Sequence, residues 1–368
     1  MLNPIIDYLT FSIKSDMKSK KLVKVDKAFM FYFLHLNESD FVDIGRKGYY
    51  EHCYTSNNIN VYQPYADRTA DMGWCVSMTG QGCRYYEEIQ KDGEFVDFWR
   101  EFLTKLRGLV KHGYSVNVSR IDIATDDYDG LLDLDLIIES ANSREFVSQF
   151  RTAYEKGYDN ILTGEGKGRT IYFGTRKSST LCRFYDKLIE QKQKYKNDSD
   201  KLKELDKINH WIRMEFEFKR EQAIKIVNII CDAEKFGDYF AKIVNGYVRF
   251  VEKDDLNVSR RTMKSWWKRF IGTLQRAKLS VGQFKSFSYE KMVRYYDKYL
   301  STTIFTILSR MNPEEFLNRT YNMAINRLKT KHNAIMADVK CTYDLTCEQW
   351  WDFLNPIKYN QRESYEIG

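Results

Sequence analysis

Apolar and polar positions recur with two different periods, and the changes of period mark the predicted elements. Short apolar runs rich in β-branched or aromatic residues predict strands at Ile5–Ile13, Phe29–Leu36 and Trp74–Met78, the last leading into a glycine turn at Gly80–Gly82. Between residues 95 and 111 the apolar positions instead fall on one helical face. The first 130 residues are therefore expected to consist mainly of strands, with a helix over 95–111.

The next hundred residues repeat this alternation. Further strands are predicted at Val116–Thr125, Arg169–Gly174, Thr180–Tyr185 and Trp211–Phe218, and helical segments over 131–155 and 188–206, the latter broken near residues 197–200. In the last of these strands, Ile212, Met214, Phe216 and Phe218 would face one way and Arg213, Glu215 and Glu217 the other. Beyond residue 222 the pattern is helical.

This order of elements predicts an α+β fold: antiparallel sheets with helices packed on one face, followed by a helical segment. The chain has 368 residues, 43% of them hydrophobic, which is enough for more than one packed domain. We place a boundary near residue 230, between a domain over residues 1–230 and a helical, basic one over 231–368.

Charge and cysteine usage exclude several classes of protein. The seven cysteines form no C-x-x-C pair, which argues against a zinc ribbon or a secreted disulfide framework. The N-terminus resembles no signal peptide, and no apolar run is long enough to span a bilayer. We expect a cytoplasmic protein that does not enter a membrane.

The net charge of +7 is modest, but its distribution is uneven. The stretch from Arg260 to Tyr289 carries eight Lys or Arg and no acid, which favours contact with a polyanion. Within it, cations alternate with aromatic residues that suit phosphate contact and base stacking; the candidates for DNA binding are Lys264, Trp266, Trp267, Lys268 and Arg269. An amphipathic helix with core aromatics and solvated cations is the alternative.

Carboxylates at strand spacing are candidates for a metal site. Asp122 and Asp126 would share a face of one strand with Arg120, and Glu215 and Glu217 a face of another. Two such strands can build an oxygen-rich site for Mg²⁺ or Mn²⁺. A solvated charged strand face is the alternative. The five histidines form no H-x-H or H-E-x-x-H pair, and no Walker A loop is present.

Tyr185 is the candidate nucleophile. It lies between Arg183 and Lys187, which would point the same way in a strand, stabilise a phenolate and bind phosphate. Because the chain has 26 tyrosines, one beside basic residues is also expected by chance.

Six segments, taken in order, resemble the trans-acting replication initiators of rolling-circle plasmids (Rep_trans type), closest to the branch that includes relaxases of integrative and conjugative elements. They run from the opening strand to Ala223: Ile5–Ile13, Met78–Arg84, Ser119–Asp127, Thr170–Ser179, Cys182–Lys187 and Trp211–Ala223. The resemblance implies a nickase fold built from ferredoxin-like or RRM-like units.

The resemblance also implies an activity. Such proteins nick one DNA strand at an origin through a tyrosine that stays joined to the 5′ phosphate, and here that tyrosine is Tyr185, flanked by Arg183 and Lys187. It implies a divalent ion on acids such as Asp122, Asp126, Glu215 and Glu217, with Asp7 a further candidate. The rival nucleophile is Tyr172, with Tyr62 and Tyr65 more remote. Origin DNA, single-stranded or in a cruciform, a host helicase and a second copy of the chain are the expected partners.

Two other classes of protein stay open on the residues alone. A DNA-binding regulator without chemistry would also need the basic C-terminal segment, and a structural or phage-assembly protein would need none of these features. The presence of Tyr185 between its cations, together with acids on two strands, favours the nickase.

Overall fold

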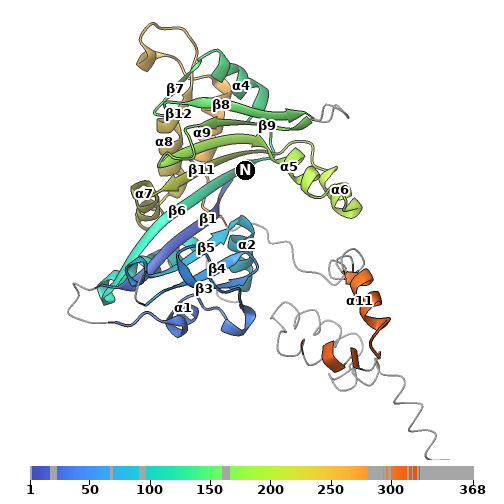
Figure 1. Cartoon of the computed structure of the whole chain (residues 1–368). Coiled ribbons are helices and arrows are strands. Elements are labelled where there is room, and N and C mark those ends of the chain that lie inside the picture. Colours follow the sequence, from blue (N-terminus) through green and yellow to red (C-terminus); the bar gives the residue numbers. More distant parts are fainter. Residues whose placement is uncertain are drawn as a thin grey trace, which may run out of the picture. The chain divides into compact units, whose positions relative to one another are not determined.

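A single ten-stranded sheet organises the fold (Figure 1). The structure, a computed structural model, describes residues 2–16, 23–66, 69–90, 97–159 and 166–280, and beyond these 293, 296, 300–312, 315–316, 318–320 and 323. The strand order is β2-β3-β4-β5-β1-β6-β11-β10-β9-β8, so the two long strands β1 and β6 lie at its centre. The pairings that define the site are all antiparallel, as the sequence predicts.

The strands of this sheet are short at its edges and long at its centre. Their bounds in chain order are β1 Asn3–Ser15, β2 Val42–Asp43, β3 Tyr50–Ser56, β4 Ile59–Pro64, β5 Trp74–Thr79, β6 Tyr114–Asp127, β8 Ala153–Asp159, β9 Gly166–Phe173, β10 Thr180–Asp186 and β11 Ile212–Lys219. Two further strands, β7 (Phe146–Ser148) and β12 (Val248–Phe250), form a separate two-stranded sheet.

Helices connect and cover the strands. Their bounds are α1 Lys27–Phe33, α2 Gly80–Ile89, α3 Phe98–Gly108, α4 Leu134–Asn142, α5 Lys187–Lys194, α6 Ser199–Leu205, α7 Glu221–Asp232, α8 Phe236–Tyr247, α9 Ser265–Leu274 and α11 Ser301–Leu308, with short 3-10 turns at Glu38–Asp40, Ala70–Met72, Leu109–His112 and Val258–Arg260. Within the described residues, no helix is long and apolar enough to cross a membrane.

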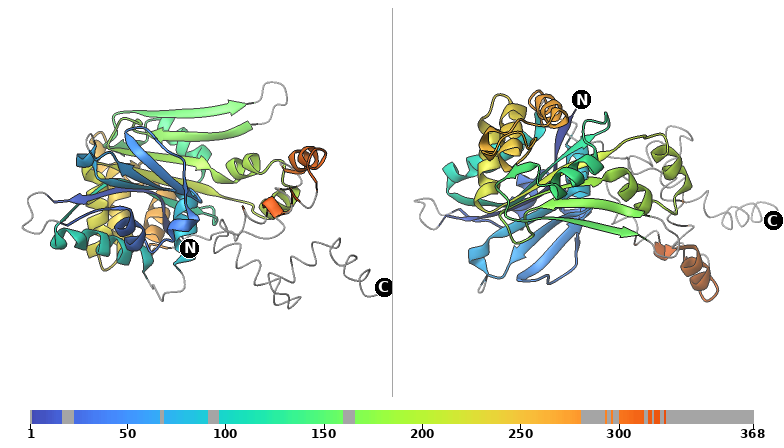
Figure 2. Two further views of the ribbon diagram at one scale, coloured as in Figure 1. Left: turned by 60° about the horizontal axis from the view of Figure 1, so that its bottom comes forward. Right: turned by 90° about the horizontal axis from the view of Figure 1, so that it is seen from above.

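The two faces of the central strands differ sharply, because side chains alternate along each strand. On one face, Phe216 of β11 contacts Phe240 of α8, and Phe184 of β10 contacts Trp267 of α9. Phe11 of β1 meets Phe102 of α3 on the same face. Seen from above, the gold helices gather along one side of the sheet (Figure 2). The α+β fold with a large antiparallel sheet is confirmed.

The chain divides into two compact units. One comprises Met1–Met30 with Asp43–Phe284, and the other Phe31–Val42 with Lys285–Gly368. The boundary that we place near residue 230 therefore falls inside the first unit. The reason is packing: α8 and α9 carry the apolar side chains that cover β10 and β11, so this part of the helical segment completes the core of the sheet domain.

Several predicted elements differ from the observed ones. Residues 29–36, predicted as a strand, lie largely in α1, because a continuous apolar run of that length has no period that separates a strand from a helix. Residues 131–155 form α4 and then strands β7 and β8, and residues 248–250 form a strand within the predicted helical segment.

The glycines after β5 begin helix α2 instead of forming a separate turn. A Cβ at Gly80 would lie 2.6 Å from Oδ1 of Asp7, and one at Gly82 would lie 2.3 Å from the Asn58 carbonyl oxygen. Glycine is therefore required for the start of α2 to approach β1 and the β3–β4 turn.

Candidate active site

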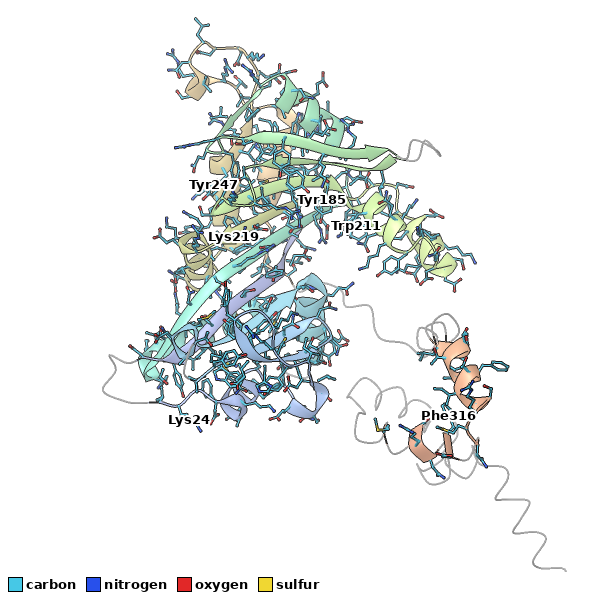
Figure 3. All side chains as sticks on the ribbon, viewed as in Figure 1. Lys24, Tyr185, Trp211, Lys219, Tyr247 and Phe316 are labelled. Atoms are coloured by element: carbon cyan, nitrogen blue, oxygen red, sulfur yellow. The ribbon has the colours of Figure 1, made fainter. Side chains whose placement is uncertain are left out.

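The face of the four central strands that lies opposite α8 and α9 carries charged and phenolic side chains from β1, β6, β11 and β10. Tyr185 of β10 lies opposite Arg213 of β11, which lies opposite Asp126 of β6. One step along, Arg183 lies opposite Glu215. Because directly paired antiparallel residues project on the same side, the register alone brings these side chains together. Figure 3 marks Tyr185 and Trp211 at one end of β10 and β11, and Lys219 near the other.

Tyr185 is hydrogen-bonded to a buried carboxylate. Its hydroxyl donates to Oε2 of Glu215 at 3.1 Å, while Arg183 donates to Oε1 of the same carboxylate. Glu215 is only 3% exposed. Burial and the neighbouring charge of Glu215 hold the pKa of Tyr185 well above its usual value, although Arg213 and Arg183 act in the opposite direction. Arg183 therefore acts in the direction expected from the sequence, but burial outweighs it and keeps the pKa of the phenol high.

Lys187 supplies a second cation beside the phenol. It is the first residue of α5, and its ammonium lies 5.4 Å from the centre of the Tyr185 ring and forms an ion pair with Glu190. Burial and the nearby charge of Arg213 lower the pKa of Lys187. The Lys187 ammonium therefore releases a proton more readily than that of an ordinary surface lysine.

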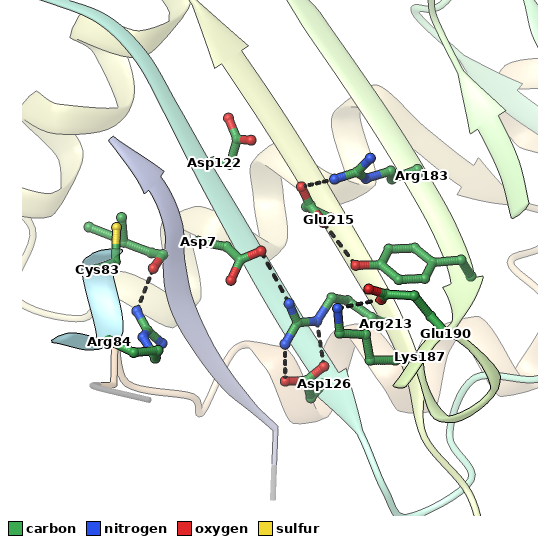
Figure 4. Close-up of polar contacts among 12 residues, drawn as sticks. Asp7, Cys83, Arg84, Asp122, Asp126, Arg183, Lys187, Glu190, Arg213 and Glu215 are labelled. Atoms are coloured by element: carbon green, nitrogen blue, oxygen red, sulfur yellow. Dashed lines mark hydrogen bonds and ion pairs between the residues drawn. The ribbon is translucent and has the colours of Figure 1, made fainter. Parts of the chain in front are cut away.

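Arg213 connects acids from two other strands (Figure 4). Its Nε and Nη2 donate to the two oxygens of Asp126 at 2.7 Å each, and Nη1 donates to Oδ2 of Asp7 at 3.2 Å. Asp126 also accepts from Nε1 of Trp211 at 2.7 Å. Burial raises the pKa of Asp126, but Arg213, Trp211 and Lys187 together outweigh burial and hold that pKa below the usual value. The charge of Asp126 is thus balanced within the protein.

The pKa of Asp122 is shifted in the opposite direction from that of Asp126. Arg120 donates to both of its oxygens, at 2.9 and 2.6 Å, and also pairs with Glu217 at 2.7 Å. Even so, burial, with Glu215 and Glu217 nearby, raises the pKa of Asp122 to about 7. The pKa of Asp7, which sits at a bulge in β1, is also raised, by burial and Glu215 against the effect of Arg213. In these two carboxylates the effect of burial outweighs that of the neighbouring arginines.

The side chains around Glu215 offer carboxylate oxygens, the ligand type that a hard divalent cation prefers. In the part of the chain that the structure describes, no group of three or more His, Cys, Asp or Glu side chains is placed to hold a metal ion as it stands. Arginines occupy the carboxylates instead: Arg120 that of Asp122, and Arg213 that of Asp126. Asp126 fits a metal least well, because Trp211 donates to it in addition to Arg213 and its pKa is held below the usual value.

The segment predicted to bind DNA divides into a buried and an exposed part. Trp267 is fully buried against Phe184, Phe250 and Phe270, and its Nε1 donates to Asn245. Its predicted stacking on bases is therefore wrong for this structure, because Trp267 is part of the core.

The other candidates of this segment stand closer to the surface. Lys264 is ion-paired with Glu145 and Glu252, and Trp266 is half-buried against Phe250. Lys268 and Arg269 lie exposed on the outer side of α9. The proposal that these cations contact DNA therefore rests mainly on Lys268 and Arg269.

Sequence reasoning understates the importance of Arg213. The alternation of β11 predicts that Arg213 lies beside Glu215. It does not predict the contacts of Arg213 with Asp126 and Asp7, which lie far away in the sequence. The signal that could have identified Arg213 is an arginine between acids on one strand face, in a chain with further acids on other predicted strands.

Comparison with known proteins agrees with this fold. Residues 116–320 match the family model described as replication initiation factor, and residues 3–105 match that of the rolling circle replication initiation protein N-terminal domain. The chain is 29% identical over 291 residues to the putative DNA relaxase NicK of Bacillus subtilis (strain 168), covering 78% of this chain and 75% of that protein.

A solved structure is similar over most of its length. The rolling circle replication initiator protein from Geobacillus stearothermophilus aligns with a TM-score of 0.63 and 27% identity, covering 76% of this chain and 99% of that one. The α+β architecture with a large antiparallel sheet is thus shared with a rolling circle replication initiator. The chain belongs to the replication initiation factor family.

Proposed function

We propose that the protein nicks one strand of origin DNA and transfers it through a covalent 5′-phosphotyrosine at Tyr185. The observation that carries this proposal is the hydrogen bond from the Tyr185 hydroxyl to the buried Glu215 carboxylate, next to the cations Arg183 and Lys187. The similar proteins, a putative DNA relaxase and a rolling circle replication initiator, support the same class of reaction.

Glu215 is the proposed proton acceptor. The Tyr185 oxygen attacks the scissile phosphorus while its proton passes to the carboxylate that already accepts its hydrogen bond. An oxygen–phosphorus bond to tyrosine forms and the bond from phosphorus to the 3′ oxygen breaks. Burial makes the phenolate costly in the free protein, so ionisation is coupled to attack on phosphate.

Arg183 and Lys187 have separate proposed tasks. Arg183, which is about one-third exposed, orients Glu215 and can reach a phosphate oxygen at the surface of the site. Lys187, whose pKa is lowered, donates the proton that the leaving 3′ oxygen requires. Reversal of these steps joins the strand again, and the energy of the broken bond is kept in the phosphotyrosine.

We further propose a requirement for Mg²⁺ or Mn²⁺, held by Asp122 and Glu215 with Glu217. The support is the raised pKa of Asp122, which marks a carboxylate in need of positive charge. When bound, such an ion would supply charge that stabilises the phosphate in the transition state. Asp126 is left out of this set because Arg213 and Trp211 already satisfy it.

We also propose which part of the chain performs which task, and which partners it has. We assign DNA nicking to the sheet domain, and contact with duplex DNA or a partner to the segment that begins with α9 and its exposed cations Lys268 and Arg269. Origin DNA is the proposed substrate, a host helicase the proposed source of strand opening, and a second copy of the chain the proposed means of ending a round.

The test is cleavage of supercoiled DNA that carries the native origin, with and without Mn²⁺. Wild-type protein should give nicked circles and a protein–DNA adduct on a denaturing gel, and Tyr185→Phe should bind the DNA without either product. An adduct that persists in Tyr185→Phe and vanishes in Tyr172→Phe would move the nucleophile to Tyr172. Origin binding without nicking under all conditions would instead indicate a regulator.

A further inference from the structure

Two tyrosines stack on each other at the outer edge of the sheet, on the face that carries Tyr185. Tyr154 of β8 lies directly opposite Tyr172 of β9, with ring centres 4.9 Å apart and ring planes 9° apart. Tyr154 is 39% exposed and Tyr172 half-buried. Their neighbours Ile171 and Phe173, which point to the other face, are buried in the core. The tyrosine pair is thus separate from the packed interior.

The strand register places this pair next to the proposed nucleophile. Tyr172 lies opposite Arg183, and Thr170 lies opposite Tyr185. Tyr172 and Tyr185 therefore occupy diagonal positions on one face of adjacent strands, a relation that separates side chains by about 7–8 Å. Tyr154 continues the same line one strand further out.

Two cations, Arg183 and Lys156, lie along the path between the two sites. Arg183 lies on it, beside Tyr172 in the register and over the Tyr185 ring at 5.5 Å. Lys156 of β8 projects on the same face, opposite Thr170. Aromatic faces flanked by cations that can meet phosphates form the pattern that binds single-stranded nucleic acid without base pairing.

We propose that the Tyr154–Tyr172 pair is a base-stacking site for the nucleotide that flanks the scissile phosphate of single-stranded DNA. The proposal rests on the proposed nicking function and adds to it the part of the strand that the protein holds at the moment of attack. It also gives Tyr172 a binding role in place of a chemical one. A base stacked there would hold the neighbouring phosphate beside Arg183 and within reach of the Tyr185 hydroxyl.

The competing explanation is that the pair only stabilises the β8–β9 hairpin. Stacked aromatic pairs across strands contribute about 0.2–1 kcal/mol to a sheet, and that role needs no DNA. The two explanations differ in what removal of one ring does to a bound base, so the test reads the base directly.

The experiment uses Tyr185→Phe protein, which leaves DNA uncut, and single-stranded oligonucleotides across the nick position as mapped with wild-type protein. Each carries 2-aminopurine at the nucleotide on one side of the nick, and stacking is read as quenching of its fluorescence. Quenching should occur at one of the two flanking positions. Adding Tyr172→Ala or Tyr154→Ala should abolish it and weaken binding about five- to hundredfold, whereas Tyr172→Phe should keep both.

Tyr239→Ala is the matched control, since Tyr239 is an exposed tyrosine of α8, the helix that packs on the opposite face. It should leave quenching and binding unchanged, and a fully paired duplex of the same sequence should show no quenching. Unchanged quenching in Tyr172→Ala, with a lowered melting temperature, would overturn the proposal in favour of the hairpin role.

The covalent adduct and the fluorescence quenching can fail independently, so the two measurements separate failure of the stacking proposal from failure of the proposed nicking function. If Tyr172→Phe in otherwise wild-type protein loses the covalent adduct, Tyr172 is the nucleophile and the stacking proposal is overturned. If wild-type protein forms no adduct at all but Tyr172-dependent quenching is seen, the stacking site stands and the nicking function fails.

Discussion

Replacing Glu215 by glutamine tests the chemistry of the site most directly. The side chain keeps its size and can still receive the Tyr185 hydrogen bond, but it loses the charge that takes up the phenol proton. If Glu215 is the general base, the nicking rate should fall about 10²–10⁴-fold, the range typical of such groups. In free energy of activation this is about 3–5 kcal/mol.

The cost in stability should be smaller than the cost in rate. Arg183 loses its charged partner, but about one-third of its side chain is exposed and can be hydrated. We expect a loss of about 1–3 kcal/mol in the free energy of unfolding, measured by urea denaturation. Single-stranded DNA binding should stay within a few-fold of wild type.

Asp122→Asn is the matched control, because it removes a carboxylate from the same face without touching Tyr185. If both acids serve only to hold a cation, both variants should recover in saturating Mn²⁺. We expect recovery for Asp122→Asn and a persistent defect for Glu215→Gln in single-turnover nicking. A Glu215→Gln variant that nicks within threefold of wild type, beside an inactive Tyr185→Phe, would refute the assignment of the base.

Three further predictions concern the rest of the molecule. Burial raises the pKa of Asp122 to about 7, so the native state keeps a proton that the unfolded chain releases near pH 4. Without metal, the free energy of unfolding should therefore decrease as the pH rises from 4 to 7, by up to about 4 kcal/mol. Asp122→Asn should flatten this pH dependence in urea titrations at several pH values. Trp267→Ala should cost about 3–5 kcal/mol in unfolding experiments, since it empties a fully buried site, and a loss below 1 kcal/mol would show that α9 is not core. Lys268→Ala and Arg269→Ala should each reduce the log–log salt slope of DNA binding by about one unit while the protein melts normally, and unchanged slopes would place the DNA elsewhere.

Local pattern predicts elements well where the period is strict. The eight-residue alternation that became β11, and the charged segment with a polar break that became α5 and α6, were predicted nearly to the residue. The aromatic run at 29–36 failed because hydrophobicity without a period fits either a strand or a helix.

The site shows a similar limit at longer range. Alternation places Glu215 and Arg213 on one face of β11 and Arg183 and Tyr185 on one face of β10. Which residue lies opposite which is a property of strand register, and register between distant strands depends on the packing of the whole sheet. The contact of Arg213 with Asp7, 206 residues away, could therefore not be predicted from the sequence.

The aromatic side chains of α8 and α9 that pack on β10 and β11 limit where chimeras of this chain and its relatives can be joined. A chimera joined near residue 230 would pair one sheet with another protein's α8 and α9, and rings such as Trp267 and Phe240 would meet surfaces that they were not shaped for. At Gly237 even a methyl group would lie 2.3 Å from the Ala277 carbonyl oxygen. A junction near residue 230 would thus divide the first compact unit, whose longer part runs from Asp43 to Phe284, and such chimeras should fold poorly.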